Sequence, residues 1–175
     1  AALSALAALT LLAVGAVLAQ VPGGEQLKPD PRNREAVKLA QDAARLESSA
    51  PDEAIALATR AQAIFETPQG KDSLYTCWTR DIRANAHGVK GEFLKSVELL
   101  ETSLATRRAR LGDRHGAVAN AYASLAYAQL NAGRPHDAAA NGARATELMQ
   151  ALAPHHPASL PAWRILQSAL ASTGD

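Results

Sequence analysis

Apolar side chains recur at helical spacing along most of the chain, in segments that short turns separate. Leu74, Trp78 and Ile82, for example, follow one another at i, i+4 and i+8, which places them on one face of a helix. Proline and glycine mark most of the turns between segments. The pattern predicts no convincing strand and seven helices, at residues 31–48, 52–65, 72–86, 92–110, 117–132, 136–152 and 158–172.

These segments repeat at a fixed interval. Residues 111–115 (LGDRH) return as residues 152–156 (LAPHH), and Tyr122 returns as Trp163, 41 residues later in each case. A fixed interval of this size, filled with helix-forming residues, predicts one helix hairpin stacked on copies of itself. The second helix of each pair also keeps two small residues seven apart, on one face: Ala54 and Ala61, Ser96 and Ser103, Ala138 and Ala145.

The spacing of the small residues after a glycine turn is similar to that of the tetratricopeptide repeat (TPR). In the third repeat the signature positions of that family are matched by Tyr122, Leu125, Ala126, Gly133, Ala138 and Ala145. The LGDRH segment resembles the Leu-Gly-x-x-His-Pro of the kinesin-light-chain-like subtype; Gly116 replaces the proline there, whereas His156-Pro157 retains it. The resemblance implies an all-α, right-handed α-α superhelix, a TPR-like solenoid of about three and a half helix-hairpin repeats.

The repeat domain is expected to cover residues 33–175. Its repeats are placed at about 33–70, 71–112, 113–153 and, in part, 154–175. Repeat two fits less well, because Trp78 and Ile82 reach core positions only if the following turn is two residues longer. Without that shift, Arg80 and Arg83 would fall on core positions. Because Gly174-Asp175 corresponds to the turn at Gly133, we expect truncation, with a natural terminal cap as the alternative.

Residues 1–19 carry no charge and are long enough to approach the span of a bilayer. Val17-Leu18-Ala19 before Gln20 fits the small-x-small pattern that precedes signal-peptide cleavage. Residues 20–32, with several prolines and glycines, form a linker. The sequence therefore favours a cleaved signal peptide and a periplasmic or secreted protein, with a membrane anchor as the alternative.

Overall composition excludes several classes of function. The formal net charge is +1 with mixed signs, which gives no argument for a nucleic-acid partner, or for a membrane partner beyond residues 1–19. Cys77 is the only cysteine, so an intrachain disulfide and a thiolate zinc cluster are excluded, and we expect it to be a buried apolar group. The run from Arg107 to Arg110 is expected to be a solvated helix end, with contact to an acidic partner as the alternative.

No motif of a catalytic or metal site is present. His155 and His156 lack an acidic or thiol ligand at i+3 or i+4, and His115 occupies the same repeat position as His156, which indicates a role in packing the turn. The sequence lacks a phosphate-binding glycine loop and a nucleophile elbow. We therefore predict neither enzymatic activity nor a cofactor nor a metal.

Helical repeats present a continuous surface to a partner. We predict a non-catalytic protein-interaction module or scaffold that binds a peptide or protein on the concave face of its first helices. The alternative is an extracytoplasmic sensor or scaffold region of a larger membrane protein, such as a bacterial receptor kinase. By the resemblance to TPR proteins, the groove residues would be Asn120, Ala123, Tyr127, Asn131, Arg164 and Ser168, joined by Arg80, Arg83 and His87 if repeat two is shifted.

Overall fold

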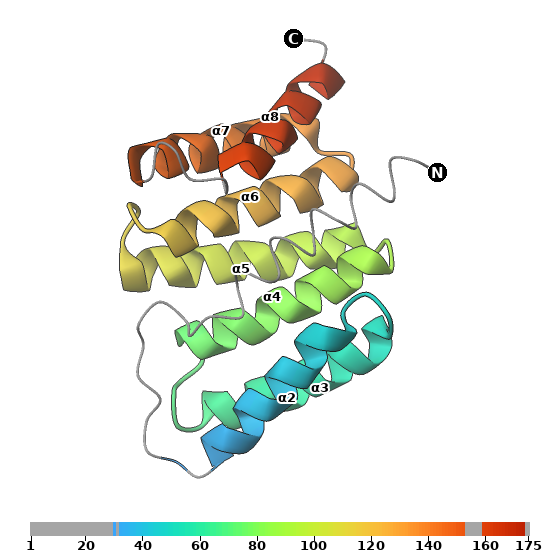
Figure 1. Cartoon of the computed structure of the whole chain (residues 1–175), viewed down its shortest axis with the longest axis vertical. Helices are drawn as coiled ribbons and strands as arrows, with labels where there is room; N and C mark the ends of the chain where they lie inside the picture. Colours follow the sequence, from blue (N-terminus) through green and yellow to red (C-terminus); the bar gives the residue numbers. More distant parts are fainter. Residues whose placement is uncertain (1–29, 31, 153–158, 174–175) are drawn as a thin grey trace.

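The structure is a computed structural model that describes residues 30, 32–152 and 159–173. Within those residues every regular element is an α-helix, and each predicted helix is present to within one turn of its predicted bounds. The helices are α2 (Arg32–Leu46), α3 (Pro51–Glu66), α4 (Leu74–Val89), α5 (Phe93–Leu111), α6 (Gly116–Asn131), α7 (Pro135–Leu152) and α8 (Ser159–Thr173). They follow one another along a single stack (Figure 1).

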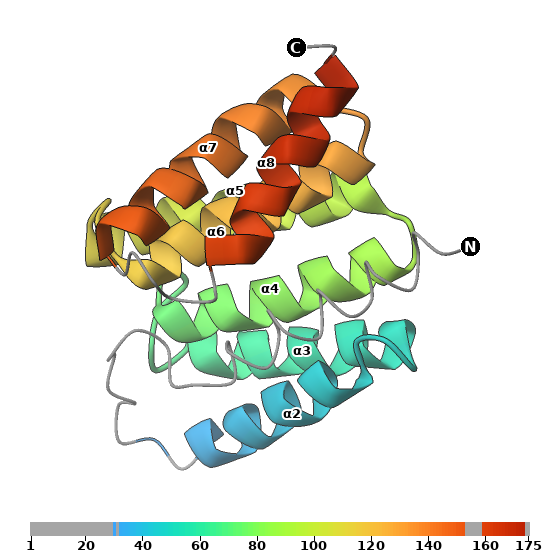
Figure 2. The same ribbon diagram turned by 45° about the horizontal axis from the view of Figure 1, so that its top comes forward.

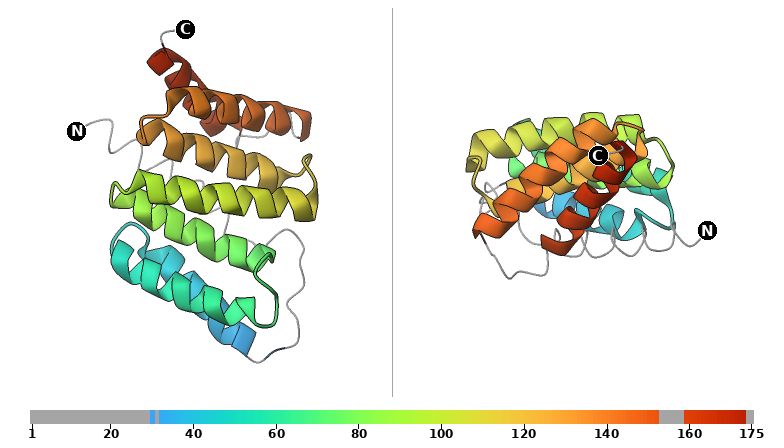
Figure 3. Two further views of the ribbon diagram at one scale, coloured as in Figure 1. Left: turned by 180° about the vertical axis from the view of Figure 1, so that it is seen from behind. Right: turned by 90° about the horizontal axis from the view of Figure 1, so that it is seen from above.

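The stack is built from helix hairpins in two layers. Each helix packs on its neighbours in sequence, and α2 also touches α4 while α6 touches α8. The first helices of the hairpins therefore lie on one side, with α8 crossing in front of α6 (Figure 2). The second helices α3, α5 and α7 are nearer when the stack is seen from behind (Figure 3). We call the side formed by α2, α4, α6 and α8 the first-helix face.

The turns of repeats two and three have the same backbone geometry. Gly91 and Gly133 have φ of 77° and 74°, values that L side chains rarely adopt. In repeat two the amide of Glu92 donates to the carbonyl of His87 at 2.9 Å, and in repeat three Arg134 donates to Gln129 at the same distance. The two turns are equally long, so the predicted two-residue shift in repeat two is wrong.

Small residues line the contacts between helices, as predicted. The six small residues at seven-residue spacing on α3, α5 and α7 are all buried. The closest approach is at Gly142 of α7, where an added Cβ would lie 3.2 Å from the Cα of Leu166 on α8. Cys77 is buried as expected, within the interface between α4 and α5. Alanine and serine therefore set the helix spacing, because their side chains occupy little volume.

The predictions for residues 1–29 lie outside the residues that the structure describes. Within the described ranges, no helix combines the length and the apolar character needed to cross a bilayer.

Candidate functional site

The surface of α6 on the first-helix face is polar but uncharged. The helix contains no acidic residue, lysine, arginine or histidine. Asn120 and Tyr127 are half-buried and Asn131 is exposed, and the Asn131 side-chain amide donates to the carbonyl of Tyr127 at 2.8 Å. Partial burial raises the pKa of the Tyr127 phenol, which keeps the side chain neutral. The structure thus leaves amide groups and an aromatic ring within reach of a ligand.

Ala123 does not contribute an accessible side chain to this surface. It is 6% exposed and packs against Ala145 of α7, with Tyr122 and Met149 beside them. The prediction that it lines the groove is corrected on this point, because its methyl group lies between the two helices of the hairpin. On α8, Arg164 and Ser168 are both exposed to solvent.

Arg80 and Arg83 do not lie on the first-helix face, contrary to the prediction. Arg80 is 8% exposed, and its Nη2 donates to the carbonyl of Lys71 at 2.7 Å. Arg83 is half-buried, and its Nη1 donates to Oε1 of Gln62 on α3 at 3.0 Å. Burial, followed by repulsion from Arg80, lowers the pKa of Arg83. Because the turn is not lengthened, both arginines occupy the core positions that Tyr122 and Leu125 take in repeat three.

His87 is also engaged within the protein. Its side chain is 13% exposed, and Nδ1 lies 2.6 Å from Oε2 of Glu92 in the turn to α5. The hydrogen bonds from His87 and then from Lys95 lower the pKa of Glu92 to about 2. His87 therefore fixes the turn between α4 and α5, and its assignment to the groove is corrected.

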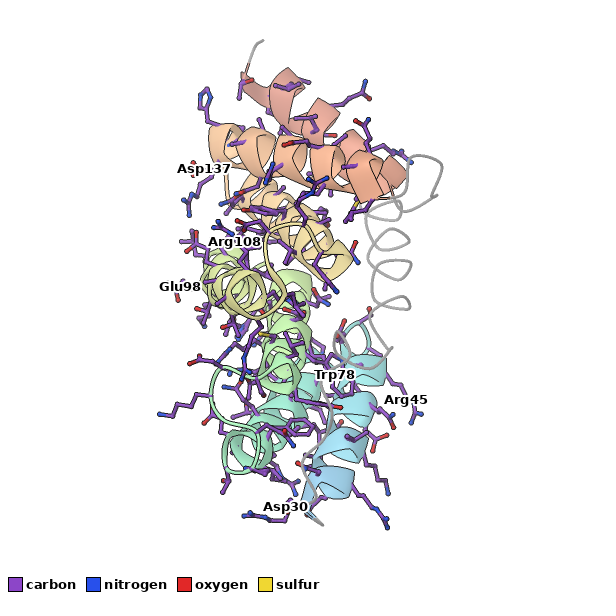
Figure 4. All side chains as sticks on the ribbon, turned by 90° about the vertical axis from the view of Figure 1, so that its left-hand side faces the viewer. Asp30, Arg45, Trp78, Glu98, Arg108 and Asp137 are labelled. Carbon is purple, nitrogen blue, oxygen red and sulfur yellow. The ribbon has the colours of Figure 1, made fainter. Side chains whose placement is uncertain are left out.

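Three other residues of α4 take the places that the shifted alignment gave to Arg80, Arg83 and His87. Trp78, Asp81 and Asn85 occupy the positions that correspond to Asn120, Ala123 and Tyr127 in α6. Trp78 is partly buried against the first hairpin and lies at the boundary with α2 (Figure 4). The amide Nδ2 of Asn85 donates to Oε2 of Glu47, after the end of α2, at 3.2 Å. An alignment of the sequence with turns of equal length in repeats two and three would have identified these three residues.

Asp81 belongs to a buried polar network between α4 and α5. Its carboxylate forms an ion pair with Arg107, and Oδ1 lies 2.7 Å from Oγ of Ser103. Sγ of Cys77 lies 3.7 Å from the carbonyl of Ser103. The expectation that the arginine run is a solvated helix end is therefore wrong for Arg107, which is buried.

The rest of that arginine run also has partners within the protein. Nε of Arg108 lies 2.5 Å from Oδ1 of Asp113, and Nε of Arg110 donates to the carbonyl of Asp72 at 2.8 Å. Both side chains are exposed, and they join the end of α5 to neighbouring loops. Arg108 lies on the side of the stack away from Trp78, together with Glu98 and Asp137 (Figure 4).

The histidine at the start of α6 has a structural role. Nδ1 of His115 accepts a hydrogen bond from the backbone amide of Ala117 at 3.1 Å, so the ring caps the helix. The sequence predicted that this histidine packs in the turn, and in the structure it caps the first turn of α6. Among the residues that the structure describes, no group of three or more acidic, histidine or cysteine side chains is placed to hold a metal ion.

Comparisons with known proteins support the architecture. No protein-family model matches the sequence, and no curated protein matches it at a significant level. The similar solved structures include two of a protein from Podosopora anserina assigned as a kinesin light chain with nearly identical TPR-like repeats, one of them a single-residue variant. Each has a TM-score of 0.74 and 20% sequence identity, covering 83% of this chain and 69% or 70% of the other. At this identity the likeness shows the fold: the chain is an all-α, TPR-like solenoid.

Proposed function

We propose that this protein is a non-catalytic interaction module that binds an extended segment of a protein partner on its first-helix face. The observation that carries the proposal is the surface of α6, where Asn120, Tyr127 and Asn131 combine partial exposure with the absence of charge on the helix. A surface helix that has no other role usually carries charged side chains. The positions of α6 that are at least partly exposed include the amides of Asn120 and Asn131 and the phenol of Tyr127, and none of them carries a charge.

These groups suit a peptide backbone. A side-chain amide offers both a donor and an acceptor, so it can pair with the N–H and C=O groups of an extended chain. The rings of Tyr127 and Trp78 add apolar area at small entropic cost. Arg164, exposed on α8, places a cation at one end of this surface. The preferred segment is therefore extended and mostly uncharged, with a carboxylate near the end that reaches α8.

A selection from a random peptide library tests this proposal. Peptides that are selected for binding to this protein should bind the double variant Asn120→Ala and Tyr127→Ala at least about tenfold more weakly than the wild type. This loss corresponds to about 1.4 kcal/mol or more of binding free energy. The matched control replaces Glu98 and Thr102, two exposed residues of α5, with alanine. Equal binding to both double variants would place the ligand elsewhere and contradict the proposal.

We also propose that the repeats act outside the cytoplasm. The proposal is supported by the uncharged run at residues 1–19, its small-x-small end at Ala19 and the linker that follows. In the native host, amino-terminal sequencing of the mature protein is expected to begin at Gln20. Recovery of residues 1–19 in the membrane fraction would instead support the alternative, a sensor or scaffold region of a larger membrane protein. Cytosolic protein with those residues intact would contradict both.

A further inference from the structure

The junction between the first hairpin and the rest of the stack contains a carboxyl group without a cation. Glu47 lies just after α2 and is partly buried, and its Oε2 accepts the hydrogen bond from Asn85 of α4 at 3.2 Å. No lysine, arginine or histidine in the described residues forms an ion pair with it. This acid therefore joins repeat one to repeat two through a single neutral amide.

The other ionised groups at this junction have partners. Asp52 of α3 pairs with Lys90 at 2.5 Å, and Asp81 of α4 pairs with Arg107 of α5. Arg80 and Arg83 are bonded to the carbonyl of Lys71 and to Gln62, and not to Glu47. Asp81 is the charged group that acts on Glu47, and its charge has the same sign.

We propose that Glu47 is a proton-dependent latch that holds the first hairpin, α2 and α3, against α4 when its carboxyl group is neutral and weakens that contact when the group ionises. Ionisation in the closed junction leaves a partly buried carboxylate near Asp81, with only the Asn85 amide to stabilise it. Movement of the hairpin away from α4 returns the carboxylate to water. In a solenoid this can happen locally, because each repeat contacts only its neighbours.

The electrostatics of the folded chain agree with this geometry. Burial, as the largest cause, raises the pKa of Glu47 to about 8; the hydrogen bond from Asn85 acts in the opposite direction, and repulsion by Asp81 adds to the increase. Adjacent contacts are also poorly satisfied. Nη1 of Arg80 and Nε of Arg83 are buried without a hydrogen-bond partner at the interface with α3 and its loop. The contact of α4 with the first hairpin therefore already contains polar groups that are not satisfied. The latch needs no partner, so it does not rest on the proposed function.

Hydrogen exchange tests the latch. After correction for the intrinsic pH dependence of exchange, the opening constant of α2 and α3 should rise between pH 5.5 and 8, by at most about tenfold per pH unit. The constant for α6 should not change. Glu47→Gln keeps the shape and the acceptor for Asn85 and should abolish the rise, whereas Glu98→Gln, at an exposed position of α5, should retain it. A pH-independent opening of the wild-type hairpin, or an equal rise in Glu47→Gln, would overturn the proposal.

Tryptophan fluorescence provides a second measurement. The chain has two tryptophans, and Trp163→Phe leaves Trp78, which packs on the first hairpin, as the reporter. Its emission should shift to longer wavelength as the pH rises from 5.5 to 8, and the shift should disappear when Glu47→Gln is added. A carboxyl carbon of Glu47 that titrates below pH 5 in the NMR spectrum would also contradict the latch, independently of any effect on stability.

Discussion

Repeats two and three share a backbone plan but fill it with different chemistry. Their turns are equally long, and both have a glycine with positive φ at the same place. At equivalent positions, however, repeat three has Leu125 where repeat two has Arg83. The two small residues of the second helix are alanines in repeat three and serines in repeat two, and all four are buried.

The comparison shows which features determine the fold. The spacing of small residues and the glycine turn determine how the helices stack, because they set the approach distance and the reversal of the chain. The large core positions accept either an apolar side chain or a polar one that finds a partner. A buried arginine is tolerated in repeat two because the carbonyl of Lys71 and the side chain of Gln62 lie within reach.

The largest expected effect concerns the buried ion pair of repeat two. Asp81→Ala leaves the guanidinium of Arg107 buried without its carboxylate, which should cost about 3–5 kcal/mol in the free energy of unfolding. Asp81→Leu combined with Arg107→Met removes both charges and should recover most of that loss. Urea unfolding followed by circular dichroism measures the free energy of unfolding of the wild type, the single variant and the double variant.

The matched control is Asp113→Ala. Its ion pair with Arg108 is exposed and screened by solvent, so Asp113→Ala should cost far less stability than Asp81→Ala. A loss for Asp81→Ala no larger than that of the control would show that the network contributes nothing specific to repeat two.

A second test compares the two repeats at one equivalent core position, which is Leu125 in repeat three and Arg83 in repeat two. Leu125→Ala in repeat three should cost about 2–5 kcal/mol, because it leaves a cavity among closely packed side chains. Arg83→Leu in repeat two should leave the stability unchanged or raise it, because it removes a buried Nε without a partner. Thermal and urea unfolding of both variants give the comparison. A large loss from Arg83→Leu would mean that the bond to Gln62 is essential to the α3–α4 interface.

The sequence predicted the helices well because their apolar periodicity is long and their turns carry glycine or proline. It did not predict the buried arginines. Aligning repeat two on Trp78 and Ile82 assumed that large apolar residues must fill the core, and this moved the arginines to the surface. Their partners are backbone and side-chain oxygens that sequence spacing does not reveal. Likewise, Asp81 meets Arg107 only after α4 and α5 pack, so no local pattern indicates the pair.

The candidate site was predicted to different degrees in the two repeats. In repeat three, where the signature residues are matched, the residues chosen from the pattern lie at the surface, except for Ala123, which packs into the hairpin. In repeat two the two-residue error in the alignment assigned core residues to the surface and surface residues to the core. Trp78 and Asn85 were therefore missed, although both belong to the same structural positions as the residues chosen in repeat three.

A third test measures how the free energy of unfolding depends on pH, which isolates the contribution of Glu47 at the junction between repeats one and two. The folded chain holds a proton on Glu47 up to about pH 8, whereas the unfolded chain releases it near the ordinary value of 4.5. Between these values the folded state binds more protons, so stability is greatest at low pH and falls as pH rises. The slope from this group is at most about 1.4 kcal/mol per pH unit. Glu47→Gln should therefore be more stable than wild type at pH 8.5 and similar to it at pH 4.5. An equal difference in stability between Glu47→Gln and the wild type at both pH values would exclude the titration of Glu47 as the cause.

The smallest expected effect concerns the contact between repeat three and α8. Gly142 in repeat three stands where repeat two has Leu100, so α8 approaches α7 closely. Alanine in a helix interior is favoured over glycine by about 1 kcal/mol. At Gly142 the added Cβ would lie 3.2–3.4 Å from backbone atoms of Leu166, which cannot move without displacing α8. Gly142→Ala should therefore show no net gain, and faster hydrogen exchange in α8.

Gly88 of α4 supplies the matched control. An added Cβ there would meet only Oγ of Ser96, at an ordinary contact distance of 3.9 Å. Gly88→Ala should therefore gain several tenths of a kcal/mol, up to about 1, by its helix propensity alone. The difference between the two substitutions reports mainly on the contact with α8, because alanine is favoured over glycine at both helical positions. Equal gains at the two positions would mean that α8 can move away at no cost, and the tight packing at the end of repeat three would then contribute nothing to stability.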